Sequence, residues 1–133
     1  MAQFSSTPEN RIAKDVVDAA FKIHTALGPG LLESVYDVVL AHELRNRGHE
    51  VARQVPIPVK YDSLTFELGF RADVVVDNLV IVELKAIEQV TGAHKKQLLT
   101  HLRLTSMKLG LLINFSEEFI KDGITRIVNG LPE

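Results

Sequence analysis

Two short apolar runs, residues 74–76 and 79–82, most constrain how this chain can fold, because only Asp77 and Asn78 separate them. β-Branched runs at this spacing predict a β-hairpin. Both runs are apolar at consecutive positions, which is typical of strands covered on both faces in the middle of a sheet. Three charged residues stand at the edge of this hairpin, where a charge needs a partner or a metal ion: Asp73, Glu83 and Lys85.

The length of the hairpin loop decides whether these charges meet. A two-residue loop would put the carboxylate of Asp73 on the wrong face, whereas a three-residue connection, residues 77–79, pairs Asp73 with Glu83. We expect the second register, or a bulge equivalent to it. Glu83 and Lys85 are two residues apart and share one face of a strand, so two carboxylates and a lysine should converge. Facing carboxylates repel, and Mg2+ is the usual cation that removes the repulsion.

Length and composition predict one domain over residues 1–133, with flexible tails at 1–8 and 129–133. The chain is 46% hydrophobic, enough for one core. No apolar run approaches the roughly 20 residues of a membrane span, and no signal peptide is recognisable. Cysteine is absent, which excludes disulfides and thiolate zinc sites. These features indicate a cytoplasmic protein without a membrane partner. The net charge of −2 still allows a local basic face.

Helices and strands follow from periodicity and from stop signals. The capping-box spacing of residues 6–9 begins a helix that Gly28-Pro29-Gly30 ends. A second helix spans 31–47, with Leu32, Val35, Val39 and Leu44 inward. Pro56 and Pro58 make residues 51–60 an edge or bulged strand. Further strands are expected at 64–70, 109–115 and 124–128, the last two after a helix at about 91–107 with Leu98, Leu99 and Leu102 buried. This order predicts a mixed α/β domain with a right-handed parallel crossover.

The predicted charges suit phosphodiester hydrolysis. A metal held by Asp73, Glu83 and the carbonyl of Leu84 would polarise a phosphate and activate a water, and Lys85 would orient that water or hold the phosphate charge. Glu33 could bind the metal through water, although acidic residues also favour a helix N-terminus for structural reasons. Gln97 would fix the substrate. Residues 89–116 contain no acid, and the bases among them form a solvated face or a phosphate-binding one: Lys95, Lys96, Arg103 and Lys108.

The chain resembles the GxxExxY proteins, a branch of the PD-(D/E)XK nuclease superfamily. The naming motif stands as residues 30–36, from Gly30 through Glu33 to Tyr36. Arg71-Ala72-Asp73 and Glu83-Leu84-Lys85 resemble the superfamily's metal-binding acid and its E-X-K, and the likeness runs from about 12 to 128. Superfamily members commonly carry Gln-x-x-x-Tyr on the helix after E-X-K; here Gln97 is present and His101 replaces the tyrosine.

The resemblance implies a restriction-endonuclease-like core, a mixed central sheet of four to five strands flanked by helices. It also implies nucleic-acid cleavage, with DNA as the expected partner, that depends on Mg2+ or on Mn2+ as a substitute. Candidate nucleic-acid contacts are Tyr36, Arg71, Lys95, Lys96, His101 and Arg103, and Tyr36 could instead be a core aromatic. Two alternatives stay open: a catalytically silent nucleic-acid-binding or protein-interaction module, and a hydrolase of small phosphodiesters. A domain of this size covers little duplex, which makes a homodimer compatible with the sequence.

Overall fold

The computed structural model describes residues 7–132. Of the tail predicted at residues 1–8, residues 1–6 lie outside this range, whereas Pro8 already belongs to the first helix. The elements are helices α1 (Pro8–Leu27), α2 (Glu33–Asn46) and α3 (Gly92–Thr105), the 3-10 helix η1 (Ile120–Gly123), and strands β1 (Val51–Tyr61), β2 (Leu64–Val76), β3 (Val80–Lys85), β4 (Leu109–Asn114) and β5 (Ile124–Val128). Within residues 7–132, none of the helices has the length and apolar character needed to cross a bilayer.

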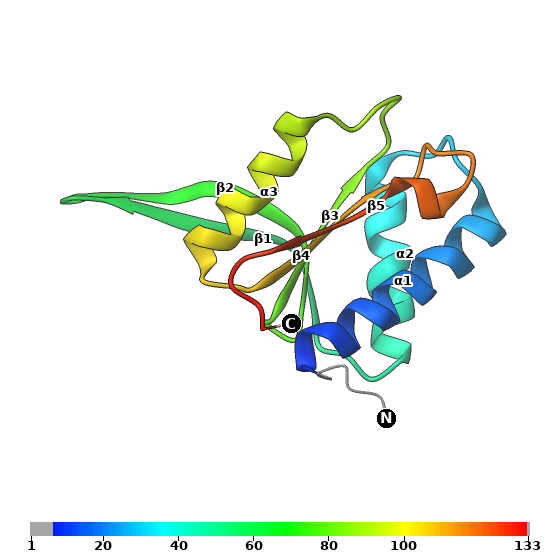
Figure 1. The fold of residues 1–133 in the computed structure, drawn as a ribbon, viewed down its shortest axis with the longest axis horizontal. Coiled ribbons are helices and arrows are strands. Elements are labelled where there is room, and N and C mark those ends of the chain that lie inside the picture. Colours follow the sequence, from blue (N-terminus) through cyan, green and yellow to red (C-terminus); the bar gives the residue numbers. More distant parts are fainter. Residues whose placement is uncertain (1–6, 133) are drawn as a thin grey trace.

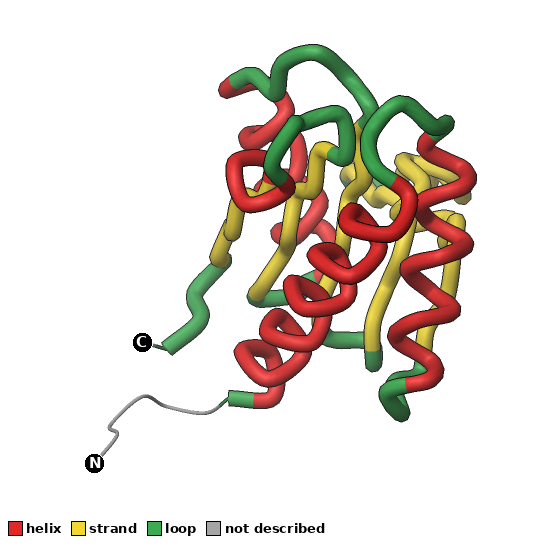
Figure 2. Tube along the Cα trace, turned by 90° about the vertical axis from the view of Figure 1, so that its right-hand side faces the viewer, coloured by secondary structure: helices red, strands yellow, loops and turns green. Residues whose placement is uncertain are grey.

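The five strands form one mixed sheet in the order β1-β2-β3-β4-β5. Helices α1 and α2 cover one face, and α3 covers the other (Figures 1 and 2). Buried side chains form a separate apolar cluster on each face, the larger beneath α1 and α2 and the smaller beneath α3. β3 and β4 are parallel and joined through α3, while the other neighbouring strands are antiparallel. The predicted mixed α/β fold and its parallel crossover are confirmed.

The register of the central hairpin is the predicted one. Val76 pairs with Val80, which leaves residues 77–79 as the connection. Asp77 and Asn78 both have positive φ, and the N–H of Leu79 donates to the carbonyl of Val76, as in the tight turns that suit hairpins. Asp73 therefore stands opposite Glu83 when the register is continued beyond Val74 and Val82.

Three local predictions were wrong in whole or in part. β2 is one continuous strand, whereas the sequence suggested a break between residues 70 and 74. The N-cap of α1 is Thr7, whose side chain accepts the N–H of Asn10 at 3.1 Å. The predicted inward face of α2 is half right: Val39 packs against the core and Leu44 is buried, whereas Leu32 is 74% and Val35 38% exposed, and Tyr36 and Leu40 are buried instead. The helix begins at Glu33 rather than at Leu31, so Leu32 is its N-cap and lies outside the helical face.

The C-terminal segment, predicted as a tail from residue 129, makes specific contacts. The side chain of Asn129 donates to the carbonyls of Leu102 and Met107, and its N–H donates to the carbonyl of Lys108. Leu131 is buried in the larger apolar cluster. These contacts fasten the end of β5 to the end of α3.

Candidate active site at the parting of two central strands

Pairing between β2 and β3 ends at Val74 and Val82, just before Asp73 and Glu83. The N–H of Leu84 donates to the Oδ2 atom of Asp73 at 2.9 Å. The carboxylate therefore takes the place of a backbone acceptor where the two strands part. On the other side of β2, Gln54 has a φ of 51° and stands between the residues that pair with Val74 and Ala72. A left-handed backbone at a residue other than glycine costs about 1 kcal/mol or more and is concentrated at functional sites.

Glu33 reaches the same region from the first turn of α2. Its Oε2 atom accepts the N–H of Ala86, the residue after β3, at 3.2 Å. The hydroxyl of Tyr36 fastens the preceding loop by donating to the carbonyl of Gly28 at 2.6 Å and accepting the N–H of Leu31 at 3.2 Å. The Tyr36 ring stacks on Phe115 in the core, with ring centroids 4.3 Å apart. The glycine-rich loop thus holds Glu33 beside the end of β3.

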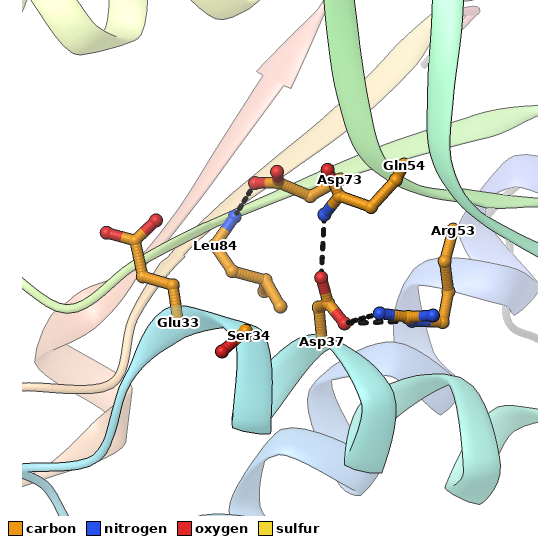
Figure 3. A pocket seen from close by; sticks show the side chains of 7 residues that line it. All are labelled: Glu33, Ser34, Asp37, Arg53, Gln54, Asp73 and Leu84. Atoms are coloured by element: carbon orange, nitrogen blue, oxygen red, sulfur yellow. Dashed lines mark hydrogen bonds and ion pairs between the residues drawn. The ribbon is translucent and has the colours of Figure 1, made fainter.

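A polar pocket of about 310 Å³ opens between α2 and the strands (Figure 3). Asp37 lies at its floor and is buried; it binds Arg53 at 2.7 Å and accepts the side-chain N–H of Gln54 at 2.7 Å. Glu33 and Asp73 lie on either side of Leu84 in this view, and Asp73 accepts the Leu84 N–H. The pocket is lined by Glu33, Ser34, Asp37, Arg53, Gln54, Asp73 and Leu84.

Glu83 points to the opposite side of the sheet. Its Oε1 atom lies 2.7 Å from the Nδ1 atom of His101 on α3, and both side chains are buried. The His101 imidazole stacks flat on Phe70, with ring centroids 3.7 Å apart and an interplanar angle of 5°. Asp73 and Glu83 therefore direct their carboxylates differently, although the charge of Glu83 still reaches Asp73 and raises its pKa. The register is right, but Asp73 turns into the pocket beside α2, while Glu83 stays beneath α3.

The carboxylates nevertheless influence one another. Burial raises the pKa of Asp73, the hydrogen bond from Leu84 and the charge of Lys85 lower it, and the charges of Glu83 and Glu33 raise it further. The net pKa of Asp73 is raised above its ordinary value. Ionised Asp73 is thus held at a cost, which a bound cation would relieve.

Residues 10–127 match the sequence profile of the PD-(D/E)XK nuclease superfamily. The chain belongs to this superfamily. No curated protein and no solved structure matches the chain significantly. Membership fits the five-stranded mixed sheet with helices on both faces, and it implies a nuclease-type site and a nucleic-acid substrate.

Superfamily nucleases typically use a divalent metal, and the donors at this site suit a hard cation. Glu33, Asp73 and Glu83 supply carboxylate oxygens, and the pKa of Asp73 is raised first by burial and then by the charges of Glu83 and Glu33. Within the described part of the chain, no three acidic or histidine side chains are gathered closely enough to enclose a metal. Mg2+ does not require such a cage, because it commonly binds one or two carboxylates, keeps several waters and takes further ligands from substrate phosphates.

The remaining predicted site residues of this nuclease-like domain differ in how exposed their side chains are. Gln97, one helical turn before His101 on α3, is exposed. Lys85 is half-buried. The four predicted basic contacts are exposed: Arg71 on β2, and Lys95, Lys96 and Arg103 on α3.

Two predicted nucleic-acid contacts are wrong. Tyr36 is fully buried, because its ring packs on Phe115 and its hydroxyl fastens the glycine loop, so the core-aromatic interpretation holds. His101 is buried between Phe70 and Glu83 and cannot present its ring to a phosphate backbone. Neither side chain lies on the surface.

Sequence reasoning missed the floor of the pocket. Asp37 is four residues after Glu33, so helical spacing already placed both acids on one face. No comparable signal marked Arg53 and Gln54, because their proximity to Asp37 depends on how β1 crosses the end of α2. The contact between Glu83 and His101 likewise needed the packing of α3 on β3.

Proposed function

We propose that the chain is a Mg2+-dependent nuclease of the GxxExxY branch that hydrolyses phosphodiester bonds, with DNA as its substrate. The observation that carries this proposal is the parting of β2 and β3. There Asp73 caps the N–H of Leu84, Glu33 caps the N–H of Ala86, and Lys85 ends β3. An uncovered acidic pocket beside a lysine is an arrangement that a structural core does not need.

The residues take the following roles in this proposal. Asp73, Glu83 and the carbonyl of Leu84 would hold the divalent metal, with Glu33 bound through water. The metal, when bound, supplies Lewis acidity that polarises the phosphate and lowers the pKa of a water. Lys85 carries the positive charge that meets the phosphate in the transition state.

The side chains around these residues would bind the substrate or orient the catalytic groups. Gln97 is exposed on α3, one helical turn before His101, and its amide would hold a phosphate or sugar oxygen. Arg53, fixed by Asp37, presents a guanidinium at the pocket wall with its direction set by the ion pair. His101 holds Glu83 by its Nδ1–H.

The basic residues of α3 supply the argument for a polymeric substrate. Lys95, Lys96 and Arg103 are exposed on the helix that also carries Gln97 and His101. A small phosphodiester would not extend over this helix, whereas a nucleic-acid backbone would place several phosphates along it.

The proposal is tested with labelled single-stranded, duplex, nicked and branched DNA, and with RNA, in Mg2+, Mn2+ or EDTA. Metal-dependent cleavage that disappears in Lys85→Ala and in Asp73→Ala supports it. Lys14→Ala is the matched control, because Lys14 lies on α1, which covers the face of the sheet opposite α3. This variant should cut normally. Cleavage that survives both site variants, or in EDTA, would contradict it.

The class of substrate is tested by replacing the α3 bases together. Lys95→Ala/Lys96→Ala/Arg103→Ala should weaken DNA binding and reduce the slope of log K against log salt by about 1 for each phosphate that is no longer neutralised. A control that removes the same charge from α1 and from the C-cap of α2, Lys14→Ala/Lys22→Ala/Arg47→Ala, should leave the slope unchanged. Equal salt slopes for the two triple variants would favour a small-molecule hydrolase.

One observation favours a second function, a catalytically silent binding module. Glu83 is engaged by His101 on the far side of the sheet from the Asp73 pocket. Calorimetric titration with Mn2+ separates the two functions. Heat of binding that is lost in Asp73→Ala indicates a competent site, and no binding of Mn2+ by the unmodified protein would favour the silent module.

A further inference from the structure

The hairpin formed by β1 and β2 extends past α3 and away from the layers of the domain (Figure 1). We call its outer part, residues 59–68, the hairpin arm. Four of its large apolar side chains are at least half exposed, Tyr61 (69%), Leu64 (55%), Phe66 (53%) and Leu68 (52%), while Val59 is partly buried. Two-stranded ribbons are marginally stable in water by themselves. Some apolar contact is therefore expected to support this one.

The strand pairing puts most of these side chains on one face. Tyr61 is opposite Leu64, and Val59 is opposite Phe66, and directly opposed residues of antiparallel strands share a face. Nearer the base, Ile57 is opposite Phe70, and both pack against the apolar cluster beneath α3. The register of the hairpin shifts between Ile57 and Val59. The apolar side is carried across this shift by β1, where Ile57, Val59 and Tyr61 alternate with polar residues and proline, and α3 covers only its base.

The sequence of the arm alternates as a strand with one buried face does. Apolar residues occupy positions 57, 59, 61, 64, 66 and 70, while Pro58, Lys60, Thr65 and Glu67 stand between them. Such alternation specifies one buried face. In the arm, that face lies in the open. The mismatch between pattern and exposure indicates a partner.

The chemistry of the arm disfavours nucleic acid. Its charged residues are Lys60, Asp62 and Glu67, so acids outnumber bases. A phosphate backbone would be repelled rather than bound. Addition of a partner's strand to the outer edge of β1 is also disfavoured, because Pro56 and Pro58 have no N–H to donate. The face of the arm, rather than its edge, is the docking surface.

We propose that the hairpin arm is the interface of a homodimer in which two copies of this chain pack their arms face to face. A two-fold contact uses the same apolar face twice, so it needs no surface beyond the one described. The arms extend beyond the domains, which lets them meet as two layers of sheet.

The exposed apolar area of the hairpin arm suits a second copy of this chain as its partner. Half-exposed large side chains offer about 100 Å² each, so Tyr61, Leu64 and Phe66 together offer about 300 Å² in each copy. Two facing arms would bury about 600 Å² from these side chains, and neighbouring atoms raise the total toward the roughly 1,000 Å² at which weak specific interfaces begin. We therefore expect a dimer that forms at micromolar concentrations.

The absence of cysteine allows a direct test. Phe66→Cys should form a disulfide-linked dimer on mild oxidation, because residues near a two-fold axis meet their own copies. Val38→Cys is the matched control: Val38 is 49% exposed on α2, and its variant should stay monomeric when oxidised at the same concentration. Equal cross-linking of the two variants would overturn the proposal.

Analytical ultracentrifugation of the unmodified protein up to about 100 μM gives the second test. A concentration-dependent dimer that Leu64→Glu/Phe66→Glu converts to a monomer, with an unchanged circular dichroism spectrum, supports the interface. A monomer at every concentration overturns it, and so does a dimer that survives the double substitution. Neither test depends on metal or on nuclease activity, so this proposal and the proposed function can fail separately.

Discussion

The Nδ1 atom of His101 lies 2.7 Å from the Oε1 atom of Glu83, and the two side chains are buried together beneath α3. The flat stack of His101 on Phe70 leaves the imidazole little freedom to turn. Glu83 accepts a hydrogen bond from an imidazole that the stack on Phe70 holds in place. The direction of the Glu83 carboxylate is therefore set before any ligand binds. Groups that orient a metal ligand in this way contribute strongly to metal affinity.

Two substitutions of His101 separate its hydrogen bond from its packing. His101→Tyr installs the residue common at this position in the superfamily, keeps an aromatic ring on Phe70 and retains a donor. His101→Phe keeps the ring but leaves Glu83 without its donor. We expect His101→Phe to lower the free energy of unfolding by about 1–3 kcal/mol and to weaken Mn2+ binding by about 10–100-fold. Urea unfolding measures the change in stability, and calorimetry measures the change in Mn2+ affinity.

His101→Tyr should retain Mn2+ affinity much closer to that of the unmodified protein. If the tyrosine and phenylalanine variants bind Mn2+ equally well, the hydrogen bond to Glu83 does not orient a metal ligand. Both variants are compared below their unfolding temperatures, so that loss of fold is not mistaken for loss of affinity.

Removing the charge of Asp73 should stabilise the metal-free protein. Asp73 is partly buried near Glu83 and Glu33, and burial together with their charges raises its pKa, so its ionised form is held at a cost. Asp73→Asn keeps an oxygen to accept the N–H of Leu84. We expect the free energy of unfolding in EDTA at pH 7 to rise by about 1 kcal/mol, and thermal stabilisation by Mg2+ to be lost. Destabilisation in EDTA would show that the charge is compensated.

His49 should make stability depend on pH. Burial alone lowers its pKa, but hydrogen bonds to Asp77 at 2.6 Å and Asp15 at 2.7 Å outweigh burial, so the pKa is raised. The folded protein then binds a proton more tightly than the unfolded chain. This contribution is fully present below the pKa of the unfolded histidine and is lost as the pH rises through the folded pKa.

Urea unfolding at pH 5.5–9, at intervals of about half a unit, should therefore show stability falling with pH in the unmodified protein. His49→Gln should flatten that fall and should lower stability at the acidic end by about 1–2 kcal/mol. A fall of the same size in the variant would assign the pH dependence to other groups.

Tyr36→Phe should loosen the loop that positions Glu33. The ring keeps its stack on Phe115, while the hydrogen bonds to the carbonyl of Gly28 and the N–H of Leu31 disappear. We expect a loss of about 1–2 kcal/mol in the free energy of unfolding. Hydrogen exchange should quicken in residues 28–33, and unchanged exchange there would mean that the hydroxyl does not fasten the loop.

The sequence predicted features set by short-range rules. The 77–79 connection followed from turn chemistry, and the parallel pairing of β3 with β4 followed from the intervening helix. Side-chain direction at the site did not follow. Alternation places Asp73 with Glu83, but the left-handed Gln54 and the N–H of Leu84 draw Asp73 toward α2. The contact between His101 and Glu83 depends on how α3 packs on the sheet, and no local sequence pattern predicts it.

The order of strands in the sheet repeats their order in the chain. Each strand can therefore join the sheet beside the one made just before it, and only the β3–β4 step must close a long loop. The two helices that cover one face are made first, before any strand exists to receive their apolar sides. During synthesis α2 can meet β1 as soon as that strand emerges, but α1 reaches the sheet mainly at β3. The apolar side of α1 therefore stays uncovered by the sheet until about residue 85 has left the ribosome.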